Sequence, residues 1–333
     1  MLKKNSYLIT GGTGSFGKAF VKKLINSSKK ISRLVIFSRD ELKQFEMAQM
    51  FPVKKYPFIR FFLGDVRDSN RVISATEGIE TIIHAAALKQ VPTTEYNPFE
   101  AIKTNIIGAN NLIEAALKNG VKNVVALSTD KACSPINLYG ATKLCSDKLF
   151  ISANNIKGNR NIKFSVVRYG NVFGSRGSVV PLFLKKNSVA LPITDKEMTR
   201  FNISLEYATD IVIWSLKNLS GGELLVPKLS SYKILDLAKA INSNCKIKII
   251  GIRPGEKIHE EMISTSDSQN TLELRKFYLI LPKLNNKIFM KYKKKYGAKK
   301  VKNGFTYSSD TNSKFLSITE LRELVKKFKV DFQ

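Results

Sequence analysis

Short apolar runs alternate with stretches of helical spacing along the first half of the chain. The runs are rich in Val, Ile, Leu and Phe, as buried strands of a parallel sheet are. They predict strands at SYLIT (6–10), RLVIFS (33–38), IRFFLGD (59–65), TIIHAA (81–86), NVVALST (123–129) and KFSVVRYG (163–170). The stretches between them predict helices over 16–26, 41–50, 69–76, 98–119 and 139–154.

Regular alternation of strand and helix predicts an α/β fold with a Rossmann-like, doubly wound parallel sheet. After residue 169 the alternation breaks up in GNVFGSRGSVVP, and a helix (205–219), a strand (223–226) and another helix (234–242) are predicted beyond it. We therefore expect residues 1–169 to form a nucleotide-binding domain to which later segments return. Residues 170–333 should form mainly a smaller C-terminal lobe that binds the substrate.

A glycine-rich turn, TGGTGSFG, follows the first predicted strand and opens the first predicted helix. Glycines at such a turn let backbone N–H groups approach a pyrophosphate at the helix N-terminus. The placement between strand and helix is the context that a dinucleotide-binding motif requires. The predicted cofactor contacts here are Gly11, Gly14, Ser15, Phe16 and Gly17.

The ends of the next predicted strands supply further cofactor contacts. An acidic residue at the second strand end would bind a ribose 2′-hydroxyl, whereas an Arg there would bind a 2′-phosphate. Because Arg39 precedes Asp40, we expect NADP, with Asp40 on the ribose as the alternative. The predicted contacts at the strand ends are Ser38, Arg39, Asp40, Lys43, Asp65, Val66, Ala85 and Ala87.

Tyr139 and Lys143 are four residues apart, so a helix would place them on one face. A phenol beside an ammonium has its phenolate favoured, and it can then accept a proton from a sugar hydroxyl during hydride transfer. Thr129 lies ten residues upstream, at the predicted strand end. Asp130 and Lys131 follow directly. Taken alone, that pair is either a loop ion pair or the acid and base of a second reaction.

Composition and charge limit the classes of ligand and the cellular compartment that we expect. Net charge is +28 in 333 residues, and lysines are densest in KYKKKYGAKK (291–300). No nucleic-acid-binding motif accompanies this charge, so we expect small anionic ligands rather than nucleic acid. No apolar run approaches the ~18 residues that span a bilayer. The few thiols and imidazoles, which lack metal-ligand spacing, favour a reduced cytoplasm and no metal site: Cys133, Cys145, Cys245, His84 and His259.

The glycine turn, Thr129, Tyr139 and Lys143 together resemble the extended short-chain dehydrogenase/reductase superfamily. Longer motifs narrow the resemblance to inverting UDP-N-acetylglucosamine 4,6-dehydratases, the first enzymes of pseudaminic acid synthesis: STDKACSPINLYGATK, RYGNVFGSRGSVVP, MTRF and RPGEK. The resemblance implies oxidation at C4 of the sugar, loss of water across C5 and C6, and return of hydride to C6. It implies Lys131 as the base at C5 and Asp130 as the acid at C6.

The same resemblance implies the substrate contacts Lys89, Asn171, Arg176, Thr199, Arg253 and Glu256. It also implies a self-associating enzyme. A 4-epimerase of the same superfamily would use Tyr139 and Lys143 without needing the Asp130–Lys131 pair. A longer, membrane-anchored dehydratase is disfavoured, because that class tends to carry Met at the Tyr139 position. A catalytically silent NADP-binding regulator and a basic nucleic-acid module are the remaining alternatives.

Overall fold

All six strands predicted in the first half form, and they lie parallel in one sheet. The structure is a computed structural model, which describes residues 5–27, 30–175, 177–185, 190–244 and 246–332. The strands are β1 (Ser6–Thr10), β2 (Arg33–Ser38), β3 (Ile59–Leu63), β4 (Thr81–His84), β5 (Asn123–Thr129) and β6 (Lys163–Tyr169). Their order reverses at β1, which pairs with β2 on one side and with β4 on the other. The predicted doubly wound α/β fold is confirmed.

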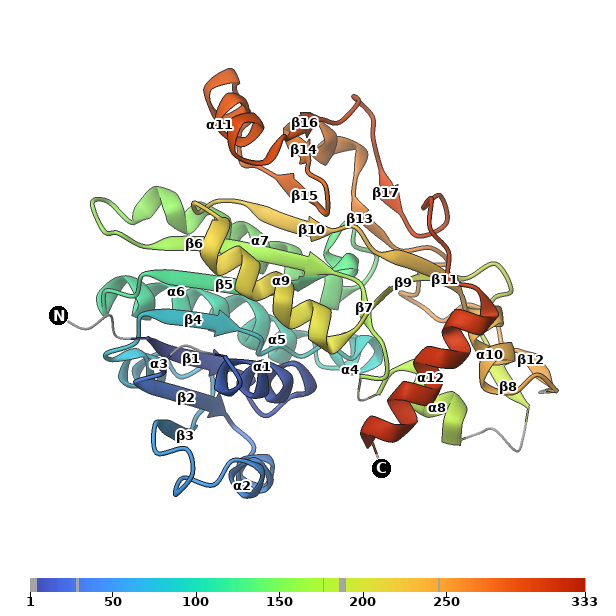
Figure 1. Cartoon of the computed structure of the whole chain (residues 1–333), viewed down its shortest axis with the longest axis horizontal. Coiled ribbons are helices and arrows are strands. Elements are labelled where there is room, and N and C mark those ends of the chain that lie inside the picture. Colours follow the sequence, from blue (N-terminus) through green and yellow to red (C-terminus); the bar gives the residue numbers. More distant parts are fainter. Residues whose placement is uncertain (1–4, 28–29, 176, 186–189, 245, 333) are drawn as a thin grey trace.

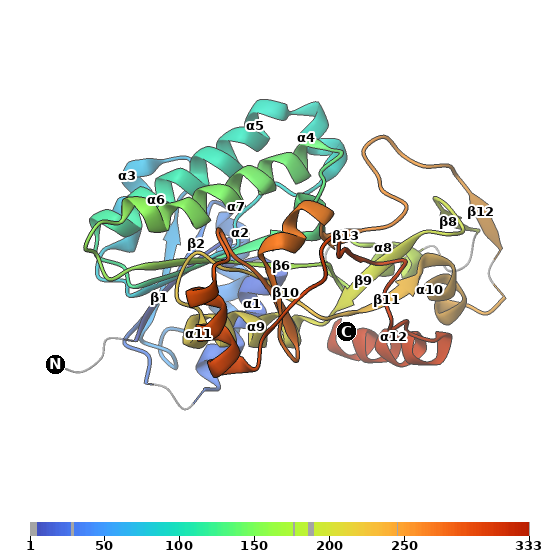
Figure 2. The same ribbon diagram turned by 90° about the horizontal axis from the view of Figure 1, so that it is seen from above.

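The helices between these strands also form close to their predicted positions. The first half contains α1 (Ser15–Ile25), α2 (Glu41–Met50), α3 (Ser69–Thr76), α4 (Val91–Tyr96), α5 (Pro98–Ile102), α6 (Gly108–Lys118) and α7 (Leu138–Ile156). The stretch predicted as one helix over 98–119 is interrupted by η1, a π-helical turn at Lys103–Ile107. Helices α3, α6 and α7 cover one face of the sheet, and α1 and α9 (Leu205–Asn218) cover the other (Figure 2).

Segments from beyond residue 170 extend the same sheet. Within the described residues it contains ten strands in the order β16-β14-β15-β10-β6-β5-β4-β1-β2-β3 (Figure 1). Strand β10 (Leu224–Pro227) pairs parallel with β6, whereas β15 (Phe277–Ile280) and β14 (Thr271–Glu273) join antiparallel. After β15 the chain forms helix α11 (Asn286–Tyr296) and then the edge strand β16 (Lys299–Lys300).

The remaining elements form a smaller lobe beside the sheet, on the right in Figure 1. It has its own cluster of buried side chains, which includes Phe183, Met198, Leu237 and Leu321. The elements outside the main sheet are β7 (Asn171–Val172), α8 (Val179–Lys185), β8 (Leu191–Ile193), β9 (Thr199–Ile203), β11 (Ser230–Lys233), α10 (Ile234–Ile241), β12 (Ile247–Ile249), β13 (Glu261–Ile263), β17 (Tyr307–Ser308) and α12 (Ile318–Phe332). No helix within the described ranges is long and apolar enough to cross a membrane.

Candidate active site

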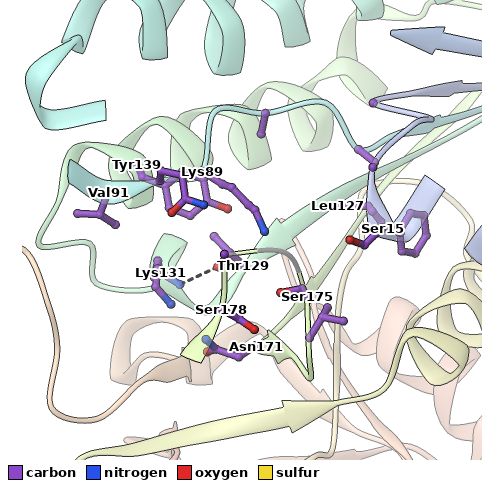
Figure 3. A pocket seen from close by; sticks show the side chains of 18 of the residues that line it. Ser15, Lys89, Val91, Leu127, Thr129, Lys131, Tyr139, Asn171, Ser175 and Ser178 are labelled. Atoms are coloured by element: carbon purple, nitrogen blue, oxygen red, sulfur yellow. Dashed lines mark hydrogen bonds between the residues drawn. The ribbon is translucent and has the colours of Figure 1, made fainter. Parts of the chain in front are cut away.

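A cleft of about 1250 Å³ lies where the carboxyl ends of the parallel strands face the smaller lobe. In open α/β sheets, ligands bind at this edge, where the strand order reverses. Figure 3 shows Lys89, Tyr139 and Asn171, which come from separate segments, around this cleft together with the neighbouring Thr129 and Lys131. All the predicted catalytic and cofactor-binding residues line the cleft.

The glycine turn lets backbone segments pack closely together, and its amide groups can bind an anion. Gly11 has a φ of +63°, and a Cβ there would lie 2.9 Å from the Ala86 amide nitrogen. A Cβ on Gly17 would lie 2.2 Å from the carbonyl oxygen of Gly12. Gly14 is the N-cap of α1 and makes no side-chain cap. The first amides of α1 therefore remain available to a phosphate group.

After the end of β2, the Asp40 side chain caps the helix that begins at the next residue. It caps α2 by accepting a hydrogen bond of 3.0 Å from the Lys43 amide, and it also pairs with the Lys43 ammonium. Arg39 is half exposed and lies 3.7 Å from Asp65. The hydroxyl of Ser38 and that of Thr13, in the glycine turn, form a hydrogen bond of 2.8 Å. The guanidinium of Arg39 is thus the more available group at this strand end.

The ends of β3 and β4 are followed by a carboxylate and a lysine amine, those of Asp65 and Lys89. Burial acts to raise the pKa of Asp65, but hydrogen bonds from Arg67 outweigh it and hold that pKa below its usual value. Val66 is buried beside it. Ala85 and Ala87 line the cleft after β4. Desolvation, followed by the charge of Lys131, lowers the pKa of Lys89, and both amines line the cleft.

Helix α7 carries the Tyr139–Lys143 pair, and its start is fixed by Asn137. The Asn137 side chain accepts a hydrogen bond of 2.8 Å from the Gly140 amide and donates one of 2.7 Å to the Gly255 carbonyl. Burial raises the pKa of Tyr139 to about 12, against Lys131 and a hydrogen bond with Thr129. Burial lowers the pKa of Lys143. Our expectation that the phenolate is favoured in the free protein is therefore wrong, because burial outweighs the nearby charge.

Asp130 and Lys131 form η2 (Asp130–Ala132) directly after β5. Asp130 Oδ1 accepts from Thr129 at 2.9 Å and from Lys131 Nζ at 3.1 Å. Lys131 Nζ also lies 2.8 Å from Oε1 of Glu260. Although burial acts to lower it, the carboxylates of Asp130 and Glu260 raise the pKa of Lys131. The role of a base, which the resemblance implies for Lys131, needs a neutral amine, whereas these carboxylates favour the charged form.

Sequence reasoning missed residues that complete this constellation. Glu260 and Arg200 are buried beside Lys131, and Arg200 Nε lies 3.7 Å from Glu260 Oε1. Asn105, in the π-helical turn η1, donates to Thr142 of α7 at 3.0 Å and clamps the Leu88 backbone with two further hydrogen bonds. Glu260 lies four residues beyond RPGE, and Arg200 lies within MTRF, so both motifs were signals that could have found them.

The predicted substrate contacts have different outcomes. Asn171 Oδ1 is buried and has no hydrogen-bond partner among the described residues, so it is available to a ligand. Arg253 donates two hydrogen bonds of 2.9 Å to Glu256, and both residues line the cleft. Thr199 is wrongly placed, since it is buried outside the cleft lining and bonded to His259 at 2.8 Å and to Ser309 at 2.7 Å. Arg176 lies outside the described residues.

Comparisons with known proteins agree with this architecture. The sequence profile of the family described as polysaccharide biosynthesis protein matches residues 7–282. The chain is 53% identical to an inverting UDP-N-acetylglucosamine 4,6-dehydratase of Campylobacter jejuni, over 98% of either protein. It is 41% identical to a UDP-glucose 4-epimerase of Rickettsia bellii, over 98% of this chain and 96% of the relative. The X-ray structure of Pen from Bacillus thuringiensis is 38% identical and superimposes with a TM-score of 0.89 over 99% of this chain and all of that one.

Proposed function

The chain belongs to the polysaccharide biosynthesis protein family, and on that premise we propose that it is an inverting UDP-N-acetylglucosamine 4,6-dehydratase. The product would be a UDP-2-acetamido-2,6-dideoxy-L-arabino-hexos-4-ulose, the first intermediate of pseudaminic acid synthesis. One observation carries the proposal: the buried Asp130–Lys131 pair lines the same cleft as Tyr139 and Lys143. Elimination needs such an acid and base, and 4-epimerisation does not.

The residues divide between two stages. Tyr139, assisted by Thr129 and Lys143, accepts the proton of the C4 hydroxyl when the sugar is oxidised. The resulting ketone makes the C5 proton acidic. Lys131 removes this proton, and Asp130 protonates the departing C6 hydroxyl. Since the free protein holds Lys131 charged, the amine must give up its proton before it can act.

The cofactor is, in our proposal, NADP, which supplies the acceptor and later the donor of hydride. The close glycine turn fits a pyrophosphate, because the absence of a Cβ at Gly11 and Gly17 lets the backbone segments of the turn approach as closely as they do. Arg39 is half exposed, whereas Asp40 is bound to Lys43, so the second strand end is better suited to a 2′-phosphate than to a bare ribose. A guanidinium binds phosphate oxygens in a bidentate way.

Substrate contacts follow from the smaller lobe and from the loop after β4. Lys89 and Asn171 would reach the sugar, and Arg253 would meet the diphosphate with Arg176. The Glu256 carboxylate would repel a diphosphate, so it would not bind this group directly. Its role would be to orient Arg253, with which it forms an ion pair. We further propose the division into residues 1–169 and 170–333, self-association, a cytoplasmic location and no nucleic-acid partner.

The experiment uses mutants that fail at different stages. Tyr139→Phe removes the phenolic proton acceptor, so C4 oxidation should be lost. Lys131→Ala should still oxidise C4 to some extent, accumulate reduced cofactor visible by absorbance, and exchange little of the C5 proton with deuterated solvent. General acids and bases contribute about 10²–10⁴-fold in rate, so the defect should be large. Near wild-type turnover of Lys131→Ala would make the pair a loop ion pair and would favour the epimerase.

A further inference from the structure

Glu260 meets Lys131 in the cleft although 128 residues separate them. Oε1 of Glu260 lies 2.8 Å from Lys131 Nζ, and Oδ1 of Asp130 lies 3.1 Å from the same nitrogen. The side chains of Glu260 and Asp130 are each 1% exposed. The Lys131 side chain is 24% exposed, so the ammonium is held between two buried carboxylates and faces the cleft.

The second oxygen of each carboxylate is buried and unpaired. Asp130 Oδ2 and Glu260 Oε2 have no hydrogen-bond partner in the part of the chain that the structure describes. Leaving a buried acceptor without a donor is costly for the folded protein. Such a cost is expected where an oxygen must be ready to take a proton or to bind a substrate hydroxyl.

Arg200 fixes Glu260 from the side of the smaller lobe. Its Nε lies 3.7 Å from Glu260 Oε1, and its other nitrogens donate to the carbonyls of Thr199, Ile258 and Lys257 at 2.7–2.9 Å. The charged and titratable groups that face Lys131 come from several elements: Asp130, Glu260, Arg200, Lys89, Tyr139 and Tyr232. Asp130 and Glu260 are the acids among them.

Building on the proposed dehydratase, we propose that Glu260 is a positioning residue of the elimination, which holds the Lys131 amine against Asp130 and governs when it carries a proton. Moving one proton from Lys131 Nζ to Asp130 Oδ1, across 3.1 Å, gives a neutral amine and a carboxylic acid. These are the base and the acid that the elimination needs. The amine then takes the C5 proton, the acid gives its proton to the C6 hydroxyl, water leaves, and the original ion pair is restored.

Glu260 opposes this transfer, because its carboxylate stabilises the charged form of Lys131, and it therefore also raises the pH at which the pair loses its proton to solvent. A carboxylate within hydrogen-bond reach favours the charged form of an amine. Although burial acts in the other direction, Asp130 and Glu260 together raise the pKa of Lys131. Glu260→Gln removes one charge and keeps the shape of the side chain. The titration of Lys131 should then move down by about 1–3 pH units, the usual effect of one close opposite charge.

The direct test is an NMR titration of the free protein with ¹⁵N-labelled lysine side chains. The Lys131 signal is assigned by its loss in Lys131→Met. In Glu260→Gln the Lys131 amine should titrate at lower pH than in wild type, and in Glu260→Asp, which withdraws the charge by one methylene group, the shift should be smaller. An unchanged titration in both variants would overturn the proposal.

The neighbouring residue offers a matched control. Glu261 accepts hydrogen bonds from Ser134 at 2.7 Å and from Cys133 at 3.5 Å, and among the described residues it makes no hydrogen bond or ion pair with Lys131. Glu261→Gln should leave the Lys131 titration where it is. If it moved the titration as far as Glu260→Gln does, the effect would be general, and the proposal would fail.

Turnover gives the second readout. The transfer keeps one proton on the Lys131–Asp130 pair, so loss of that proton to solvent at high pH leaves no acid for the C6 hydroxyl. The alkaline fall of kcat should therefore move to lower pH in Glu260→Gln, and Glu260→Asp should restore part of the wild-type profile. A loss of kcat at every pH with an unmoved profile would make Glu260 only structural. If wild type gave no 4-keto-6-deoxy product, the proposed function would fall, while the NMR titration would still decide what Glu260 does to Lys131.

Discussion

Gly140 joins the two chemical pairs of the site, and Gly140→Ala tests that connection. This glycine lies in the first turn of α7, next to Tyr139, and packs on the backbone of η2. A Cβ at Gly140 would lie 2.1 Å from the carbonyl oxygen of Lys131, and real Cβ atoms do not come closer than 3.0 Å. The two segments must therefore separate by about 0.9 Å, the difference between these distances. Tyr139 and Lys143 would move away from Asp130 and Lys131.

Two effects of opposite sign compete in this variant. Ala is the better helix former by about 1 kcal/mol, so without the clash Gly140→Ala should stabilise the protein. With the clash it should destabilise the protein and lower turnover by about 10²-fold, the cost of a misplacement of about 1 Å. Urea denaturation and product formation measure both effects. Cys145→Ala, at an exposed position of α7, is the control and should change neither. A stabilised Gly140→Ala with normal turnover would refute the reasoning.

Three further substitutions test the cofactor site and the contribution of ion pairs to the stability of the fold. Arg39→Ala should weaken NADP binding by about 1.5–3 kcal/mol and leave NAD binding nearly unchanged, because only NADP carries the phosphate that the guanidinium would meet. Equal losses in titrations with the two cofactors would remove the basis for NADP. Asp147→Asn breaks the buried pair with Arg168, which has a contact of 3.2 Å, and should lower the free energy of unfolding by about 3–5 kcal/mol. Lys326→Ala removes an exposed pair with Glu323 and should cost less than about 1 kcal/mol in the same denaturation assay.

The first half of the fold was predictable because its strands are buried on both faces. Continuous runs such as RLVIFS have no other place to bury their side chains, and β2 forms over those residues. The π-helical turn at Lys103–Ile107 was not predicted, because one extra residue in a helix leaves the apolar spacing almost unchanged. The short strands of the smaller lobe were missed because they carry too few residues to show a period. Several are two or three residues long, such as β7 and β8.

The site was predictable where its residues share one segment and unpredictable where they meet across the fold. Thr129, Asp130, Lys131, Tyr139 and Lys143 all line the cleft. The contact of Glu260 with Lys131 arises only when the lobe folds against the strand ends, so spacing could not show it. Together with Asp130, that contact raises the pKa of Lys131, although the role of a base requires this amine to lose its proton.

Thr199 shows the opposite error. Its hydroxyl is occupied within the lobe by His259 and Ser309, and the adjacent Arg200 lines the cleft in its place. A motif can therefore identify the right segment while the alternation of side chains along a strand decides which residue reaches the ligand.

We propose that one cleft performs both redox chemistry and elimination. The most direct measurement is NMR of the product formed from UDP-N-acetylglucosamine by the purified protein in deuterated water. We predict a 4-keto-6-deoxy sugar with deuterium at C5 and the inverted, L-arabino configuration. A product that keeps its C6 hydroxyl and differs from the substrate only at C4 would contradict it, and would make the protein a 4-epimerase.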